Sequence, residues 1–415
     1  MISGLASYLY LAVAARTLGP ERYSALSVLW ALTFLTALGF FVPIEQEVSR
    51  ALAARRVHGH GGAPVVRRAA SLAGLAVVVL LVTITIGRSR LRGRLFDGSG
   101  LLVIGLGLGL AGYAGLHLLR GMLAGQGRFA AYAVLVAAEP VLRLAAALVL
   151  WAGGAATVGS LGLVLGGAPI ATAVLALSAT RHVTTGPDVG WNEVGVALAD
   201  LVMASLLVQV LMNGPAVAAK LLAGQAEQAE AGTFVAALVL TRVPLFLFAA
   251  VQAALLPHLS ALASRRRHQA FVSSVRRVAA LSGLAGAVFA GFISIAGPGA
   301  LRIVFGRSFS LARPQLAALA AGSGIAMVTL VMAQALIALS AHRLVAIGWV
   351  VAVGGSALTL FIHGGLSSRV ARAFLLGSLA GALAMAVLLW TQVVRSRSQP
   401  GVSPPEAPGL IIEPV

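Results

Sequence analysis

Long apolar segments recur along the whole chain, and this pattern constrains its fold more than any other feature. Hydrophobic residues make up 59% of the sequence and charged residues only 10%, whereas roughly a quarter of a soluble domain is charged. Each segment approaches the ~20 residues that a helix needs to cross a bilayer. The sequence therefore predicts an all-α, polytopic membrane protein with about twelve transmembrane helices, at approximately residues 2–15, 24–46, 69–87, 101–121, 129–152, 157–178, 194–218, 233–257, 277–298, 315–339, 344–363 and 370–393.

The first apolar segment, residues 2–15, is short for a complete crossing. It has neither the basic start nor the small-residue cleavage site of a signal peptide, so we interpret it as a first span. We expect it to be completed by residues upstream of Met1, or to lie where the membrane is locally thinner.

The charge of the chain is strongly basic, with 30 Lys and Arg against 12 Asp and Glu. The basic residues cluster between apolar segments, as they do in the cytoplasmic loops of membrane proteins. We therefore explain the charge by membrane topology, and we expect no nucleic-acid partner. The chain has no cysteine, which excludes disulfides, thiolate nucleophiles and cysteine-ligated metals.

Part of the first half of the chain is repeated in the second half. Residues 51–56 (ALAARR) recur as 261–266 (ALASRR), and residues 67–76 (RRAASLAGLA) recur as 276–285 (RRVAALSGLA). Both copies flank strongly basic loops, which should face the cytoplasm. Because an even number of spans separates these loops, the two halves have the same orientation. This predicts two lobes of about six helices each, related by a pseudo-two-fold axis along the membrane normal.

The expected organisation is an N-terminal lobe over residues 1–185, a C-terminal lobe over 186–398 and a proline-rich, disordered tail over 399–415. Both termini are expected in the cytoplasm. One feature fits this topology poorly, because it places a group of arginines outside the cell: Arg88, Arg90, Arg92 and Arg94.

Charged residues within the spans need a reason, since each costs at least ~2.5–3.5 kcal/mol at the bilayer centre. Glu139 and Arg143 lie four residues apart, on one face of a helix, where they can form an ion pair. Pro140 between them predicts a broken helix, which membranes tolerate only against protein or a watery cavity. The pair either lines a cavity or simply makes this span insertable.

Arg242 and Pro244 repeat the combination of arginine and proline, and no carboxylate lies within one turn of Arg242. Arg120 lies near the end of its span, where it lines a cavity or extends to the headgroups. Glu45 is a second cavity candidate, and Pro215 is expected to break its span and expose carbonyls. Asp200 could be an exposed carboxylate in a first helical turn.

Two short motifs match cofactor or metal sites, but the sequence around them lacks the structure that such sites need. The glycines of residues 107–112 match GxGxxG, but they lie inside an apolar span, where glycines permit close helix packing. His58 and His60 lack further metal ligands, and no Walker sequence is present. We therefore expect no cofactor, no metal and no enzymatic activity.

Several segments resemble the polysaccharide (oligosaccharide-lipid) flippase family of the multidrug/oligosaccharidyl-lipid/polysaccharide exporter superfamily. Their order and spacing carry the resemblance over most of the chain: residues 15–23 (ARTLGPERY), 119–129 (LRGMLAGQGRF), 231–234 (AGTF), 241–248 (TRVPLFLF) and 256–260 (LPHLS). The chain departs from the family at Ser24, where members often have Gly, and at Pro215, where many carry an acidic residue. The second departure puts ion coupling at that position in doubt.

The resemblance implies translocation of an undecaprenyl-diphosphate-type lipid-linked glycan across a bacterial plasma membrane. Transport would proceed by alternating access, driven by an ion gradient or the membrane potential. A buried diphosphate needs cations, and the candidates are Arg120, Arg143 and Arg242. The candidates for ion coupling or charge balance are Glu45, Glu139 and Asp200, and for hinges Pro140, Pro215 and Pro244. Membrane lipids, a glycan polymerase or glycosyltransferases are the expected partners.

Other functions stay open at this point. The nearest alternative is a cation-coupled drug or metabolite antiporter of the same superfamily. A membrane glycan polymerase or glycosyltransferase generally has a large extracytoplasmic loop or an acidic catalytic motif, and neither is visible. A membrane scaffold without transport activity has no obvious use for the buried Arg242.

Overall fold

The computed structural model describes residues 2–177, 183–188 and 190–398, and every regular element in these ranges is a helix. The predicted tail over 399–415 lies outside the described residues. The elements follow in the order α1 (Ile2–Val57), α2 (Ala63–Ile86), α3 (Arg88–Arg90), η1 (Leu91–Leu95), α4 (Gly100–Gly125), α5 (Phe129–Ala152), α6 (Val158–Leu177), α7 (Trp191–Leu222), η2 (Gln225–Glu227), α8 (Gln228–Thr241), α9 (Val243–Ser264), α10 (His268–Phe305), α11 (Arg313–Ala338), α12 (His342–Thr359) and α13 (Leu366–Ser398).

Eleven helical segments of the described chain are long and apolar enough to cross a membrane. Large apolar side chains point outward along them, for example Ile295 on α10, which is 78% exposed. Water would oppose such a surface, whereas lipid accepts it. The predicted fold class is confirmed: the chain is an all-α, multi-pass membrane protein.

Helix α1 contains the first two predicted spans. Gly19 inside it has a φ of 70° and a ψ of 168°, and Pro20 follows. Glycine adopts this conformation without the strain that a side chain would bring. The ring of Tyr10 stacks on that of Trp30 with centroids 5.9 Å apart, whereas a straight helix would separate the two residues by ~30 Å. The chain therefore reverses at Gly19, and the two spans are separate crossings.

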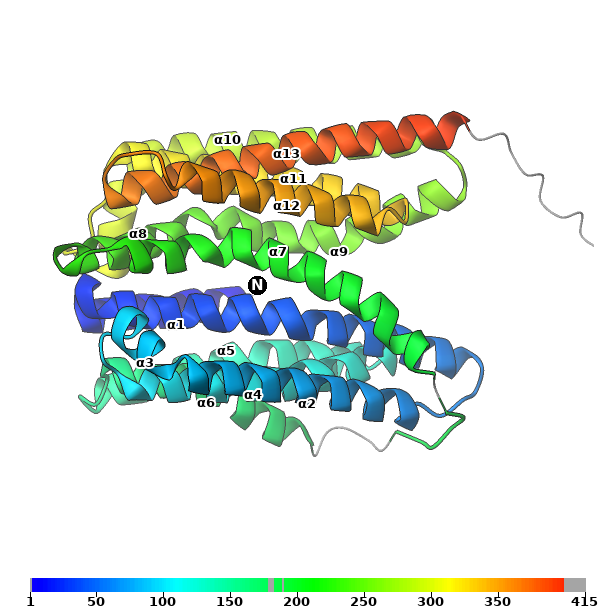
Figure 1. The fold of residues 1–415 in the computed structure, drawn as a ribbon, viewed down its shortest axis with the longest axis horizontal. Coiled ribbons are helices and arrows are strands. Elements are labelled where there is room, and N and C mark those ends of the chain that lie inside the picture. Colours follow the sequence, from blue (N-terminus) through cyan, green and yellow to red (C-terminus); the bar gives the residue numbers. More distant parts are fainter. Residues whose placement is uncertain (1, 178–182, 189, 399–415) are drawn as a thin grey trace, which may run out of the picture.

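The helices lie in two groups (Figure 1). Helices α2–α6 lie on one side of the part of α1 that follows Gly19, and α7–α13 lie on the other side. We call α1–α6 the N-lobe and α7–α13 the C-lobe. The exact boundary predicted near residue 185 stays a prediction. Within the N-lobe, α4 and α6 approach closely at glycines, since a Cβ built on Gly166 would lie 2.0 Å from the carbonyl oxygen of Gly105.

Helix breaks were predicted at Pro140 and Pro215, and a hinge was predicted at Pro244. Helix α5 runs through Pro140 and α7 runs through Pro215 without interruption, so the predicted breaks there are wrong. A proline removes one backbone hydrogen bond, and the rest of a long, packed helix holds its direction. Near Pro244 the helix does break, because Arg242 is non-helical and separates α8 from α9.

The two lobes touch at the end of the molecule where α1 turns, which we call the Gly19 end. Lys220 at the end of α7 donates hydrogen bonds to Ser24 of α1 and to both carboxylate oxygens of Asp97, at 2.7–2.8 Å. The ring of Tyr23 also packs edge-on against Phe309, with centroids 5.8 Å apart. The N-lobe and the C-lobe are thus joined at this end by polar and aromatic contacts.

Candidate functional site

A fully buried ion pair lies in the N-lobe. Arg143 is 0% exposed and donates a hydrogen bond of 2.8 Å to Glu139 one turn earlier on α5. It donates further bonds to the hydroxyl of Tyr113 on α4 at 3.2 Å and to Ser7 on α1 at 2.9 Å. Only the Nε of its guanidinium lacks a hydrogen-bond partner. The predicted pair between Glu139 and Arg143 is present, and it joins three helices.

Aromatic rings cover the same guanidinium. The centre of the Arg143 guanidinium lies 4.6 Å from the ring of Trp30, 5.4 Å from Tyr10 and 5.8 Å from Phe34. The quadrupoles of these rings stabilise a cation that has left water. Arg143 therefore has carboxylate, hydroxyl and aromatic partners already in place.

A second polar group surrounds Glu45 on α1. His117 Nδ1 of α4 lies 2.6 Å from one carboxylate oxygen of Glu45, and the Tyr132 hydroxyl of α5 donates to the other at 2.8 Å. The side chain of Glu45 is 14% exposed, and that of His117 is buried with its Nε2 unpartnered. Arg120 lies within electrostatic range of Glu45, and its Nε is also buried without a partner.

The two polar groups are neighbours. Tyr113, which bonds to Glu139 and Arg143, lies one helical turn from His117 on α4, and their ring centroids are 6.0 Å apart. We call the whole set the N-lobe network, and it consists of Ser7, Glu45, Tyr113, His117, Arg120, Tyr132, Glu139 and Arg143. Its two carboxylates and two arginines balance each other, so that His117 decides its net charge.

Arg242 lies in the C-lobe, on the other side of the first span of α1. It donates a hydrogen bond to the carbonyl oxygen of Met212 on α7, and its guanidinium lies 5.4 Å from the ring of Phe374. Tyr8 of α1 is within its electrostatic range, while the adjacent Ser7 binds Arg143. Thus α1 separates Arg242 from Arg143. No carboxylate pairs with Arg242 in the described part of the chain.

Asp200 does not join these groups. It is exposed on α7, and it forms no ion pair with any residue that the structure describes. Its exposure agrees with the prediction of an exposed carboxylate, but α7 begins at Trp191, so the predicted position in a first helical turn is wrong. Asp200 is therefore not brought together with Glu45 or Glu139.

Sequence reasoning missed several residues of the polar clusters. His117 and the tyrosines of the N-lobe network were not singled out because only formal charges were searched within the spans. Lys220 and Asp97 lie just beyond the predicted spans, and their pairing joins positions 123 residues apart in sequence. Only His117, a titratable residue inside an apolar span, carried a signal that could have found it.

Comparisons with known proteins find sequence relatives that match this chain over nearly its full length. The chain is 31% identical over 392 residues to the uncharacterized protein Rv3630 of Mycobacterium tuberculosis, covering 92% of this chain and 88% of the relative. The same values hold for the uncharacterized protein Mb3654 of Mycobacterium bovis. The uncharacterized protein Rv1510 of Mycobacterium tuberculosis is also 31% identical, over 90% of this chain and 86% of its own. No established protein-family profile matches the sequence.

Solved structures share the fold. An inward-facing MATE family multidrug resistance transporter of the MOP superfamily superposes with a TM-score of 0.68 at 15% identity, over 94% of both chains. An outward-facing form of a MATE family transporter gives 0.63 at 17% identity, over 96% of this chain and 95% of that one. The likeness supports the superfamily fold and does not single out the flippase family. This chain therefore belongs to the family of the mycobacterial proteins Rv3630 and Rv1510, and it is a multi-pass membrane protein with the fold of MATE transporters.

Proposed function

We propose that this protein is a secondary transporter that works by alternating access and exchanges H⁺ for a small organic cation or metabolite. The observation that carries the proposal is the N-lobe network, a buried set of titratable side chains whose charges balance. Titratable groups inside a membrane protein are costly and commonly mark ion pathways. The shared fold supports transport, because MATE structures of this fold are known in inward-facing and outward-facing forms.

The proton site of this proposal is Glu45 with His117. Their contact of 2.6 Å allows one proton to be shared between a carboxylate and an imidazole. Glu45 is also the more exposed of the two carboxylates, since Glu139 is almost completely enclosed. A proton that enters here adds a positive charge to a balanced network. A cationic substrate would then be repelled, and this is the electrostatic condition for exchange.

The partners of Arg143 support this substrate over a lipid diphosphate. Glu139, Tyr113 and Ser7 accept hydrogen bonds from the two terminal nitrogens of its guanidinium, and aromatic rings cover it. To bind a diphosphate, Arg143 would have to leave a buried carboxylate uncompensated, which costs several kcal/mol. This favours the antiporter over the flippase that the sequence resemblance suggests.

The flippase is the second candidate function, and a different observation favours it. Arg242 and Arg120 are charged groups without a carboxylate in direct contact among the described residues, and each has a buried, unpartnered Nε. Such donors suit the phosphate oxygens of a lipid-linked glycan. In this case Arg242 and Arg120 would hold the diphosphate, while Glu139 and Arg143 would form a structural pair. Glycosyltransferases or a glycan polymerase would be its partners.

Transport by the purified protein in liposomes with an acidic lumen tests the proposal. Ethidium added outside should accumulate while the luminal pH rises, and Glu45→Gln should abolish the exchange. Glu47→Gln is the matched control, because this carboxylate lies on the same helix but pairs with Arg50. A second set of liposomes carries a fluorescent lipid-linked oligosaccharide. Movement of that lipid without ethidium exchange would replace the antiporter by the flippase, and movement of neither would contradict both.

A further inference from the structure

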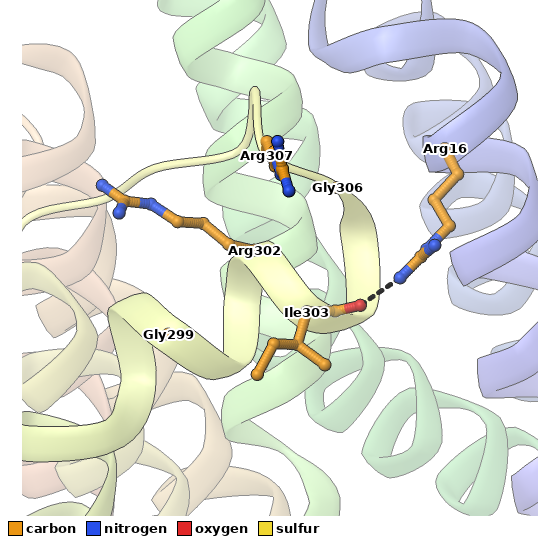
Figure 2. A pocket seen from close by; sticks show the side chains of 6 residues that line it. All are labelled: Arg16, Gly299, Arg302, Ile303, Gly306 and Arg307. Carbon is orange, nitrogen blue, oxygen red and sulfur yellow. Dashed lines mark hydrogen bonds between the residues drawn. The ribbon is translucent and has the colours of Figure 1, made fainter.

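A pocket of about 700 Å³ opens at the Gly19 end, between α1 and the end of α10. Three of the six residues that line it are arginines, and none is acidic: Arg16, Gly299, Arg302, Ile303, Gly306 and Arg307. Figure 2 shows Arg16 reaching from α1 to the last turn of α10, which carries Arg302, with Arg307 just beyond it. The pocket therefore combines cations from both lobes.

The charges of these arginines are not neutralised by protein. No carboxylate lies within ion-pair distance of any of the three in the described part of the chain. Arg16 donates to the carbonyl oxygens of Ile303 and Val304, so it already covers the negative end of the α10 dipole. Arg302 and Arg307 are exposed, and their long side chains can turn toward a ligand. The pocket is electrostatically suited to an anion.

An apolar stripe along α10 leads to this pocket. Its members are spaced by three or four residues, which places them on one face of the helix, and all are more than half exposed: Leu281, Leu284, Val288, Phe292 and Ile295. Gly299 continues the spacing and lines the pocket, and the next turn carries Arg302 and Ile303. The surface therefore changes from apolar to cationic within one turn, as the membrane does between its hydrocarbon core and its headgroups.

We infer that this pocket binds the phosphate of an anionic phospholipid, with the acyl chain of that lipid along the α10 stripe. Ile303, which is 73% exposed, places the pocket on the outer surface, where bulk lipid reaches it without any movement of the lobes. A phospholipid is thus favoured over a substrate that must enter between the lobes. Because Arg16 belongs to α1 and the other two arginines to the C-lobe, the bound headgroup holds the two lobes together. The inference does not rest on the proposed transport function.

Binding of phosphatidylglycerol to the full-length protein in detergent, measured by native mass spectrometry, tests the inference. Arg302→Gln with Arg307→Gln should weaken binding roughly ten- to thirtyfold. Arg16 stays unchanged, since it also bonds to the backbone of α10. The control is Arg88→Gln with Arg90→Gln, which removes two exposed arginines of α3 outside the pocket, and it should change binding less than about twofold.

Phosphatidylcholine serves as the neutral probe, and farnesyl diphosphate represents a prenyl-linked phosphate. A size-exclusion profile confirms that each variant is folded. If the pocket variant and the α3 variant lose phosphatidylglycerol binding equally, the site is overturned. Such a result would indicate a general attraction between the basic protein and the anionic lipid. Equal binding of phosphatidylcholine would overturn the role of the anionic headgroup. Binding of farnesyl diphosphate without binding of phosphatidylglycerol would overturn the inference that the ligand is a phospholipid.

Discussion

Arg143 is a full charge kept inside an apolar bundle, and its partners explain how. Glu139 neutralises it, the hydroxyls of Tyr113 and Ser7 accept hydrogen bonds from it, and Trp30 covers its face. The sequence predicted the ion pair from a spacing of four residues on one helix. It could not predict Ser7 or Tyr113 as partners, because these lie on other helices and carry no charge.

Breaking this pair should destabilise the protein strongly. Glu139→Ala leaves the buried Arg143 without its counter-charge, and we expect a loss of about 3–5 kcal/mol in unfolding free energy. Chemical unfolding in detergent, followed by tryptophan fluorescence, measures this loss. Arg88→Ala is the comparison, because Arg88 is exposed and forms no ion pair with the described residues, so its loss should change the unfolding free energy by less than about 1 kcal/mol. Equal stability of Glu139→Ala and the parent protein would contradict the role of the pair.

At the scale of helices, glycine decides how closely α4 and α6 pack. The Gly-rich run of residues 107–112 was predicted to serve helix packing, and the close approach of Gly109 to Gly166 and of Gly112 to Ile170 agrees with this interpretation. Helix breaks were less predictable. A proline interrupts a helix only where the packing around it permits, so Pro140 and Pro215 lie in continuous helices. Near Pro244 the helix does break, at Arg242.

Two adjacent glycines of α6 give a matched test of this packing. A Cβ on Gly166 would lie 2.0 Å from a backbone oxygen of α4, whereas one on Gly167 would meet nothing within 4 Å. Gly166→Ala should therefore cost roughly 1–3 kcal/mol through overpacking. Gly167→Ala should be neutral or slightly stabilising, because alanine favours a helix. Thermal unfolding in detergent measures the stability of both variants. A Gly166→Ala variant as stable as the parent protein would contradict the predicted clash.

At the scale of the whole molecule, the N-lobe and the C-lobe are joined at the Gly19 end. Lys220 is buried and binds Asp97 and Ser24 across the two lobes. If the protein alternates between two states, this contact must break when the Gly19 end opens. The same end carries the arginines of residues 88–94, which the basic-loop rule alone would have placed in the cytoplasm.

Weakening this contact should open the Gly19 end. Because the chain has no cysteine, Ser27→Cys introduces a single thiol, one turn deeper on α1 at a site that is 1% exposed. A second change, Asp97→Asn, should raise the rate of labelling by a water-soluble maleimide about tenfold or more, since it removes the charge opposite Lys220. Asp188→Asn at the opposite end is the control. An unchanged labelling rate in Asp97→Asn would show that Lys220 does not hold the end closed.

The sequence by itself determined the fold class, the approximate spans and the pair of Glu139 with Arg143. These features depend on local composition and on helical spacing, which are properties of neighbouring residues. Only the tertiary structure decided that Glu45 meets His117, that Lys220 meets Asp97 and that Arg16 reaches α10. Such contacts join residues far apart along the chain, and they form only when whole helices settle against one another. The packing between helices therefore decided where the buried charges meet, and hence where the candidate site lies.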